Sequence, residues 1–483
     1  MTERHILPIA HPRPLDVLSD EALVAVREAT HEVLERTGVE VRSERLLKEL
    51  DKAGARADLE AGRALLPREV VDEALAGVPR APTFASREPG LDLVLDGSHG
   101  YLAVDGCAAE IADLLTDERR PSTKADVAQV SRIADALPQI SFLWQPVSAR
   151  DVPVHTEPLH NLHAQLANTG KHIQGMSAVT AEQAQGVVEM ARIVAGGEEA
   201  LRERPIVSAF QCSISPLTYD GGPLEAALVF AEAGVPCGFM VMPIACATAP
   251  ATATGALVIS NAEVVAGAVA LQLLSPGAKT FYGSCATVMD LRSGAATCGG
   301  PEDLLFQMAS AQLARSYGLP SAIGTFATGA KLSDWQAGTE NGLSGTSSWL
   351  AGADMLCGAG LLYGARVYSP TQLLLDAELF DAIAGMARGF GVSDDELAAE
   401  VIEEVGPGGH FLAADHTLRH MRELWQSRLF SRESWEEWEA EGRPEPRDRA
   451  RERARQILAE HRPHPLPDGV DGRLIEVIER HER

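Results

Sequence analysis

The chain of 483 residues has little lysine, few aromatic residues and no paired cysteines. Six lysines leave arginine to supply nearly all of the positive charge, and aromatic side chains make up only 5% of the residues. The seven cysteines are scattered, and no two of them form a CxxC motif. Such usage is typical of a reducing compartment and argues against a disulfide scaffold or a thiolate zinc site. We therefore expect a cytoplasmic protein.

Positive charge is also scarce relative to negative charge. The 42 lysines and arginines face 68 aspartates and glutamates, which gives a formal net charge of −26. A protein this acidic repels nucleic-acid phosphates and anionic membrane surfaces. We expect neither nucleic acid nor a membrane surface among its partners.

The sequence contains no uninterrupted hydrophobic run long enough to suggest a membrane span. Its N-terminal segment has no apolar core of the kind found in secretory signals. The longest stretch without charge, residues 233–262, is broken by Pro236, Pro243 and Pro250. Because a spanning helix needs about 20 consecutive apolar residues, this stretch instead predicts a strand, a loop and a buried helix.

From about residue 100 onward, short apolar segments alternate with helical patterns. Eight such segments over roughly 270 residues are the number and length expected for a (β/α)8 TIM barrel. A doubly wound open sheet is the alternative, and the absence of a GxGxxG motif after the first strand disfavours it. The predicted strands are 101–106, 140–146, 172–177, 206–213, 238–244, 279–285, 321–327 and 353–360.

The same patterns divide the chain into three regions. Residues 1–98 form an N-terminal helical extension, residues 99–385 the barrel, and residues 386–483 a C-terminal helical segment packed on the barrel. The fold class is therefore α/β, with a helical lead-in and a helical tail.

Reacting groups of a barrel enzyme lie at the C-terminal ends of its strands and in the loops that follow. Tyr282, Phe326, Trp335 and Trp349 fall near these positions in a chain that has few aromatics. Aromatic faces attract a quaternary ammonium group through the ring quadrupole. Ordinary core packing is the alternative interpretation of the same residues.

Lys331 follows the seventh predicted strand, where some barrel enzymes carry a Schiff-base lysine. With Asp334 three residues later, an ion pair that shapes the loop is an equally simple interpretation. His416 and His420 have the spacing of metal ligands, but the HExxH glutamate is absent, so no metal site is expected. The glycine-rich segment 405–417, which contains His410, allows close approach of backbone to a ligand.

Longer stretches of the chain carry a family resemblance from about residue 15 to residue 440. They include LERTGVEVRSERLLKELDKAGARAD, HNLHAQLANTGKHIQG, MDLRSGAATCGGPEDLLFQMASAQLARSYGLPS, GAKLSDWQAGTENG and VGPGGHFLAADHTLRHMRELWQSRLFSRESWEEW. In these stretches the chain resembles the trimethylamine methyltransferase family, and specifically its members that lack pyrrolysine.

The resemblance implies a barrel that transfers a methyl group from a methylated amine to cob(I)alamin. The cobalamin sits on a separate cognate corrinoid protein, which docks over the barrel mouth. The position equivalent to pyrrolysine falls between Thr328 and Trp335. Loss of pyrrolysine makes a quaternary amine such as glycine betaine the favoured substrate class, and the family resemblance also implies a homo-oligomer.

On this interpretation Tyr282, Phe326 and Trp335 form the face for the cation. A quaternary ammonium is already activated for attack at its methyl carbon, so the protein needs no nucleophile of its own and no bound metal. His172, Lys331 and His410 are the candidates for binding a substrate carboxylate, and Glu302 and Asp334 are the candidates for catalytic counter-charge. The alternatives are a Schiff-base barrel lyase that uses Lys331 and a non-catalytic protein that binds methylated amines.

Overall fold

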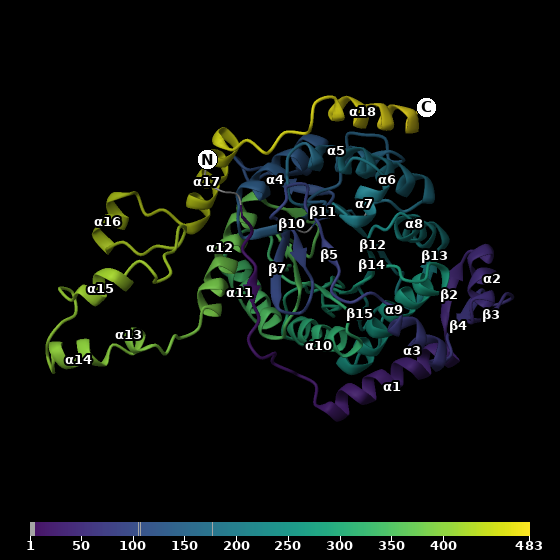
Figure 1. Ribbon diagram of the computed structural model, residues 1–483, viewed down its shortest axis with the longest axis horizontal. Helices are drawn as coiled ribbons and strands as arrows, with labels where there is room; N and C mark the ends of the chain where they lie inside the picture. Colours follow the sequence, from purple (N-terminus) through teal and green to yellow (C-terminus); the bar gives the residue numbers. More distant parts are fainter. Residues whose placement is uncertain (1–4, 105, 107, 176) are drawn as a thin grey trace.

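A computed structural model describes residues 5–104, 106, 108–175 and 177–483, and its centre is a closed parallel barrel (Figure 1). Each strand pairs in parallel with the next, and the last strand pairs with the first, which closes the barrel. The strands are β7 (His99–Val104), β10 (Ile140–Trp144), β11 (His172–Gly175), β12 (Val207–Cys212), β14 (Cys237–Val241), β16 (Tyr282–Ser284), β18 (Ser321–Gly324) and β19 (Met355–Ala359).

The eight predicted strands are therefore confirmed, each within a few residues of its predicted bounds. The pairing of β19 with β7 excludes the doubly wound open sheet, since an open sheet leaves its two outer strands unpaired. The strands are buried along nearly their whole length, because the barrel core covers one face and a ring of helices covers the other.

Helices surround the barrel between consecutive strands. Most of them begin at a side chain that accepts a hydrogen bond from the backbone of the first turn, such as Thr123, Thr180, Thr252 and Ser369. The surrounding helices are α4 (Lys124–Ala136), α5 (Glu157–Leu166), α6 (Ala181–Ala195), α7 (Glu198–Glu203), α8 (Gly221–Glu232), α9 (Ala253–Leu274), α10 (Pro301–Tyr317), α11 (Trp335–Leu350) and α12 (Pro370–Ala387).

Helix α9 is the one described helix that is long and apolar enough to cross a membrane by length and composition. In the fold, 78% of that apolar window is buried, against the barrel and under two N-terminal helices. The uncharged stretch of the sequence thus forms strand β14, a loop and the start of a core helix, as predicted.

The N-terminal hundred residues combine helices with small strands. Helices α1 (Asp20–Arg36) and α3 (Arg68–Ala76) pack on α9, and α2 (Glu44–Lys52) lies beside a four-stranded sheet. That sheet consists of β2 (Val39–Arg42), β3 (Arg56–Asp58), β4 (Arg63–Leu65) and β13 (Thr218–Asp220). Strand β1 (Ile9–Ala10) adds to β7, and a hairpin of β5 (Thr83–Phe84) and β6 (Leu93–Val94) precedes the barrel.

The C-terminal region has two parts that differ in how they meet the barrel. Helices α17 (Pro446–Glu460) and α18 (Val470–His481) pack on it, against α12 and α4 and against α6 and α5 respectively. Between them and α12, four short helices form an arm that projects away from the barrel (Figure 1). The arm contains α13 (Asp394–Leu397), α14 (Ala399–Val405), α15 (Asp415–His420) and α16 (Trp435–Ala440).

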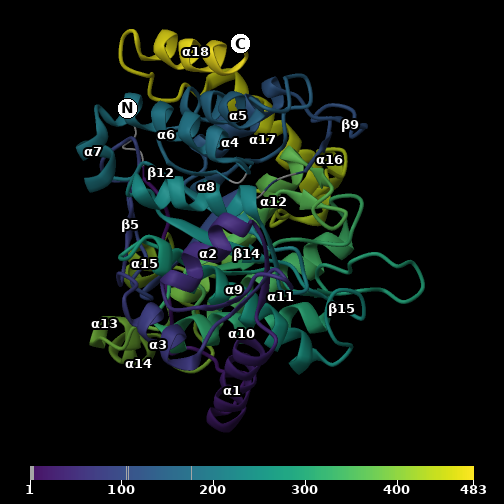
Figure 2. The same ribbon diagram turned by 90° about the vertical axis from the view of Figure 1, so that its right-hand side faces the viewer.

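The two ends of the barrel are built differently. Figure 2 shows β5 on one side of the barrel and β15 (Ile244–Ala245) on the other. The ring of Phe84 on β5 belongs to the buried cluster inside the barrel, at the end where the strands begin. At the end where the strands finish, β15 pairs with β17 (Thr287–Val288). A second small sheet there contains β8 (Glu110–Ala112), β9 (Arg119–Pro121), β20 (Leu361–Leu362) and β21 (Val367–Tyr368).

Candidate active site

A cavity of about 270 Å³ opens where the barrel strands end. Trp144, Cys212 and Gly324 line it from the last residues of three different strands. Cys285 lines it from the loop after β16, and Ala327 from the loop after β18. Lining residues at the carboxyl ends of many strands are the usual construction of a barrel active site. Its volume is slightly below the range of drug-sized pockets, about 300–1,000 Å³, so the cavity suits a small ligand.

One wall of this cavity is aromatic. Trp144 is the last residue of β10, and Phe210 lies in β12. Their ring centroids are 4.4 Å apart, at an interplanar angle of 45°. Met240 and Met242 continue the wall along β14. Aromatic rings and thioethers form a polarisable apolar surface that suits methyl groups on a cation.

Asp303 brings a buried carboxylate to the same cavity. It lies in the first turn of α10 and is only 2% exposed. Its Oδ2 accepts hydrogen bonds from the Thr297 hydroxyl and from the backbone N–H groups of Gly299 and Gly300, at 2.9, 2.9 and 2.7 Å. Its Oδ1 is buried and has no hydrogen-bond partner in the described part of the chain.

The electrostatics of Asp303 favour a bound cation. Burial raises the pKa of this carboxyl, and the interactions with Thr287 and with the donors of its own loop counteract that rise only in part. A positive charge in the cavity would supply the missing interaction and hold the carboxyl in its ionised form. Among the described residues that line the cavity, Asp303 is the only carboxyl and none is a lysine, arginine or histidine, so any net charge of the lining is negative.

Two further polar groups shape the cavity from behind. Gln307, one turn after Asp303, accepts hydrogen bonds at Oε1 from Ser344 and Ser348, which directs its amide NH₂ group away from these hydroxyls. Glu263 on α9 accepts hydrogen bonds from Ser213, Ser215 and the backbone of Leu217. Burial raises the pKa of Glu263, and these contacts fix the loop after β12 that carries both serines to the cavity.

The aromatic residues predicted from the sequence do not meet at this cavity. The side chain of Tyr282 points outward from the barrel, and its hydroxyl donates to Asn261 on α9. Phe326 is fully buried, and its ring lies close against Gly345 of α11. Trp349 is buried at the far end of α11 and donates to the carbonyl of Ala10. The prediction of a cation face is therefore corrected: Tyr282 and Phe326 are packing residues of the outer core.

His172 lies at the opposite end of the barrel from the cavity. It is the first residue of β11, stacks on Phe84 with centroids 4.8 Å apart, and donates to the carbonyl of Ala85. Burial lowers its pKa to about 4, so the ring is neutral near pH 7 and offers a substrate carboxylate no charge. Its role as a carboxylate ligand is corrected to a structural one.

His410 and Glu302 also lie outside the cavity. His410 is exposed on the loop that joins α14 to α15 in the projecting arm. Glu302 is exposed in the first turn of α10. Its neighbour Asp303 occupies the position that was predicted for Glu302, since one residue along a helix rotates the side chain by about 100°.

The remaining predicted residues belong to the loop after β18. Asp334 is the N-cap of α11 and accepts from the backbone of Gln336 and Ala337. Trp335 is 88% exposed. Lys331 donates to the carbonyl of Gly329 at 2.6 Å and lies over the ring of Tyr363. These residues form the outer rim of the mouth, and of this loop it is Ala327 that reaches the inner cavity.

Two further pairs of histidines lie outside the inner cavity. His160 and His163 on α5 pair with Glu482 and Asp471 of the C-terminal helix, both at 2.9 Å. His416 and His420 form, with Asp395, the one group in the described residues whose ligand atoms lie close enough for a metal ion. That group is on the projecting arm and does not line the inner cavity.

Four residues of the cavity are not among those predicted from the sequence: Trp144, Phe210, Asp303 and Gln307. Trp144 and Phe210 lay within correctly predicted strands, so their inward direction could have been inferred from the two-residue period of each strand. Asp303 carries a local signal as well, because a carboxylate three residues after an N-cap glycine often turns back toward that cap.

Comparisons with a family model, with individual proteins and with solved structures all match this chain to methyltransferases. The model of the family described as trimethylamine methyltransferase matches residues 3–483. A trimethylamine methyltransferase of Desulfitobacterium hafniense is 36% identical, covering 96% of this chain and 93% of its own length. A glycine betaine methyltransferase from another strain of that species is 33% identical, covering 95% of each chain.

Among solved structures, the monomethylamine methyltransferase of Methanosarcina barkeri matches with a TM-score of 0.54. It covers 94% of this chain and 90% of that chain, with 12% sequence identity. At that identity the likeness supports the barrel fold and carries nothing about individual site residues.

Proposed function

This chain belongs to the trimethylamine methyltransferase family, and we propose that it moves a methyl group from a quaternary or tertiary methylated amine to cob(I)alamin carried by a cognate corrinoid protein. A glycine betaine-like compound is the proposed donor. The observation that carries this proposal is the inner cavity at the barrel mouth, where the Trp144–Phe210 wall and the Asp303 carboxylate line one small space.

These residues match what the methyl donor needs. The cation lies against Trp144 and Phe210, where the ring quadrupoles attract it without hydrogen bonds. Asp303 balances its charge from a site shielded from water, where an ionic attraction is stronger than in solvent. The amide NH₂ group of Gln307 is the proposed donor for a substrate carboxylate, and it would select a betaine over a simple methylated amine.

The cavity also defines how the acceptor reaches the substrate. A corrin macrocycle is far larger than a space of about 270 Å³, so the corrinoid is expected to stay at the mouth while the amine occupies the cavity. When bound there, cob(I)alamin supplies the nucleophile that takes the methyl group. The chain's own contribution is to hold the amine so that one methyl group faces the opening, and to exclude water from it.

The Schiff-base alternative finds little support in the site. Lys331 lies on the outer rim, with its ammonium group hydrogen-bonded to a backbone carbonyl and close to the Tyr363 ring. It does not line the inner cavity. Borohydride reduction in the presence of substrate should therefore leave Lys331 unmodified.

The test compares Asp303→Asn with its neighbour Glu302→Gln. Both substitutions remove one negative charge from the first turn of α10, but only Asp303 lines the cavity. We expect Asp303→Asn to lower kcat/KM for glycine betaine about 30-fold or more, because it removes one partner of a buried charge pair. Glu302→Gln should stay within twofold of wild type, and the melting temperatures of both variants should be recorded on the same preparations.

The assay is formation of methylcobalamin from cob(I)alamin with glycine betaine, trimethylamine and tetramethylammonium as donors. Tight amine binding without methylation of either free or protein-bound cob(I)alamin would favour the non-catalytic binding protein. Equal losses in the two variants would remove Asp303 from the proposed site. A chelator should not change the rate, and restoration of a chelated enzyme by zinc would contradict a metal-free mechanism.

The pH dependence gives a second check on Asp303. Its pKa is raised by burial, so its proton is lost at higher pH than from an ordinary aspartate. Affinity for the cation should therefore fall as the pH drops through that raised pKa. The Asp303→Asn variant should lack this fall.

A further inference from the structure

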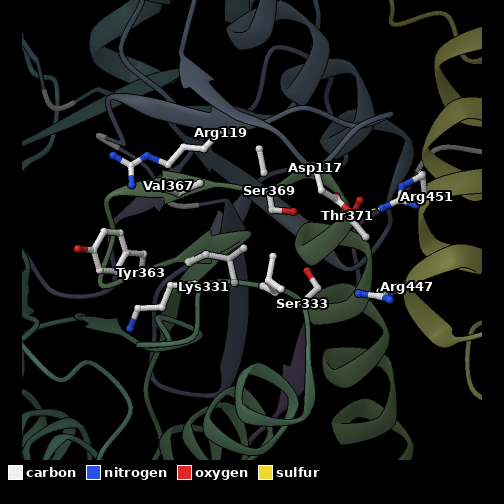
Figure 3. Close-up of a pocket in the computed structure, with 13 residues that line it drawn as sticks. Asp117, Arg119, Lys331, Ser333, Tyr363, Val367, Ser369, Thr371, Arg447 and Arg451 are labelled. Carbon is white, nitrogen blue, oxygen red and sulfur yellow. Dashed lines mark hydrogen bonds and ion pairs between the residues drawn. The ribbon is translucent and has the colours of Figure 1, made fainter.

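The rim of the barrel mouth carries a concentration of positive charge that the inner cavity does not use. Three cations lie close to the ring of Tyr363: Arg119, Lys331 and Arg366, at 5.9, 5.1 and 5.2 Å from its centroid. We call these four residues the basic rim. Figure 3 shows Arg119 and Lys331 reaching toward Tyr363 from two different segments.

The rim lines two adjoining hollows, of about 310 and 830 Å³, that share Lys331 and Tyr363. Basic residues outnumber acidic ones there, in a chain whose formal net charge is −26. The basic lining residues are Arg119, Arg292, Lys331, Arg366, Arg447 and Arg451, and the acidic ones are Asp117, Asp290 and Glu340.

The acidic residues among these are already engaged. Asp117 pairs with Arg451, and Asp290 pairs with Arg292 at 3.1 Å. Glu340 accepts from the Thr328 hydroxyl and from the backbone of Gly329.

Among the described residues, fewer of the rim's cations than of these acids have a partner in an ion pair or a hydrogen-bond network. Arg119 pairs with Glu110 at 2.9 Å. Lys331 and Arg366 have no carboxylate within ion-pair distance in the described part of the chain. Arg119, Lys331 and Arg366 gather around one ring, at 5.1–5.9 Å from its centroid. The Debye length at physiological ionic strength is about 8 Å, so salt does not fully screen charges that lie this close together. Their mutual repulsion is thus only partly screened, and an anion placed between them would relieve it.

Exposed apolar side chains adjoin the rim. Leu332 lines the smaller hollow and is 52% exposed. Trp335 is 88% exposed at the start of α11, directly before Gln336, which lines the larger hollow. An exposed tryptophan beside arginines, lysine and tyrosine has the composition of a hot spot in a protein interface. A small anion would leave these apolar side chains exposed to solvent, whereas a bound protein would bury them.

The larger hollow adjoins the inner cavity, because Met242 and Ile244 line both. A partner bound to the basic rim would therefore lie next to the proposed substrate site. We infer that the basic rim, with Trp335 as its apolar anchor, is the docking surface for an acidic face of the protein that carries the methyl acceptor. This inference rests on the proposed function, since it names the surface that the acceptor protein uses.

The experiment uses the full-length enzyme and two acceptors: free cob(I)alamin, and cobalamin bound to the corrinoid protein of the same organism. Lys331→Glu and Arg366→Glu reverse charges on the rim. Lys52→Glu makes the same change at an exposed position in the last turn of α2. Complex formation with the cobalamin-loaded protein is measured by surface plasmon resonance, which does not depend on turnover.

We expect each rim variant to lower kcat/KM for the protein-bound acceptor about tenfold or more at low salt, because steering by charge changes association rates by 10-fold to 1,000-fold. The difference in kcat/KM between the rim variants and wild type should become smaller as salt is added. Methyl transfer to free cob(I)alamin should stay within twofold of wild type, and Lys52→Glu should match wild type with both acceptors. Trp335→Ala should weaken complex formation at high salt as well as at low salt.

Three results would overturn the inference. Equal losses with both acceptors would place the rim in the chemistry or the fold, and unchanged complex formation in every rim variant would remove it from docking. Binding of inorganic phosphate that depends on Lys331, with complex formation unaffected, would make the rim a site for a small anion. If wild type methylated neither acceptor but bound the corrinoid protein through the rim, the proposed function would fail while the docking surface stood.

Discussion

At the scale of single residues, the site is decided by which way each side chain points. Residues that are neighbours in sequence face different sides of their strand or helix in two places. Phe281 belongs to the cluster inside the barrel, whereas Tyr282 belongs to the cluster under the helices. Glu302 faces solvent, whereas Asp303 lines the cavity. A substitution at one of each pair therefore tests the site, and a substitution at the other provides its control.

For the aromatic wall, Trp144 is the residue that tests the site and Trp335 is its control. A cation–π contact is worth about 0.5–2 kcal/mol, so Trp144→Leu should weaken binding of glycine betaine by roughly 2- to 30-fold. Trp335→Ala, far out on the rim, should leave that affinity unchanged. Calorimetry with glycine betaine and with 3,3-dimethylbutyrate, in which carbon replaces the ammonium nitrogen and the positive charge is lost, separates the two contributions. Loss of affinity for both ligands alike would indicate packing in place of a cation–π contact.

At the scale of elements, the loop after β18 and the start of β11 have roles that differ from their predicted ones. The loop after β18 contains Lys331, a predicted ligand of a substrate carboxylate, but Lys331 belongs to the basic rim, where it meets the partner in our proposal. Lys171, just before β11, donates to the carbonyls of Ala134, Leu137 and Ile140 at 2.6–2.8 Å. It thus joins the end of α4 to the barrel at the face opposite the active site, where residues serve stability.

Asp135 on α4 is the counter-charge that this arrangement needs. Burial raises the pKa of its carboxyl, but a 2.7 Å hydrogen bond with His461 and the charge of Lys171 outweigh that effect and lower the pKa to about 2. Asp135→Asn leaves the buried lysine without compensation, so we expect a loss of about 3–5 kcal/mol in the free energy of unfolding. Urea denaturation near pH 7 measures it, with Asp151→Asn on the nearby surface as the control.

The low pKa of Asp135 also sets the direction of its pH dependence. A carboxyl whose pKa is lower in the folded protein stabilises the fold at pH values above its unfolded pKa of about 3.9. That stability is lost as the pH falls from about 4 toward 2. The Asp135→Asn variant should lose less stability than wild type over this interval, and an equal loss in both would contradict the assignment.

At the scale of the whole molecule, charge and apolar surface are unevenly distributed. The acidic chain keeps a basic rim at one end of its barrel. The arm of helices α13 to α16 exposes large apolar side chains, among them Phe390 and Leu412 with exposed fractions of 101% and 86%. Exposed apolar side chains of this size are common where proteins associate, and the homo-oligomer proposed from the family resemblance would cover them.

This proposal predicts an assembly larger than the 51.5 kDa chain. Light scattering coupled to size exclusion should show an oligomer for wild type and a smaller species for the double variant Phe390→Asp, Leu412→Asp. Val154, which is 86% exposed on the barrel side of the chain, supplies the matched control as Val154→Asp. A monomeric wild type would refute the homo-oligomer expected from the family resemblance.

The sequence by itself determined the barrel. Its eight apolar segments, their spacing and the caps between them are local signals, and each strand formed where those signals lay. Family-wide stretches of sequence determined the class of enzyme in the same way, because they extend along the whole chain. The uncharged stretch before and within α9 was likewise interpreted correctly from its prolines and its length.

Only the tertiary structure decided the site. Asp303, Trp144 and Phe210 come from three elements that are far apart in sequence, and closure of the barrel brings them to one cavity. His172 is different, because it is the first residue of a predicted strand, and in a parallel barrel the first residues lie at the end opposite the reacting groups. Local sequence sets which segments form strands and helices, whereas the angle at which each element packs on the next selects the side chains that face the substrate.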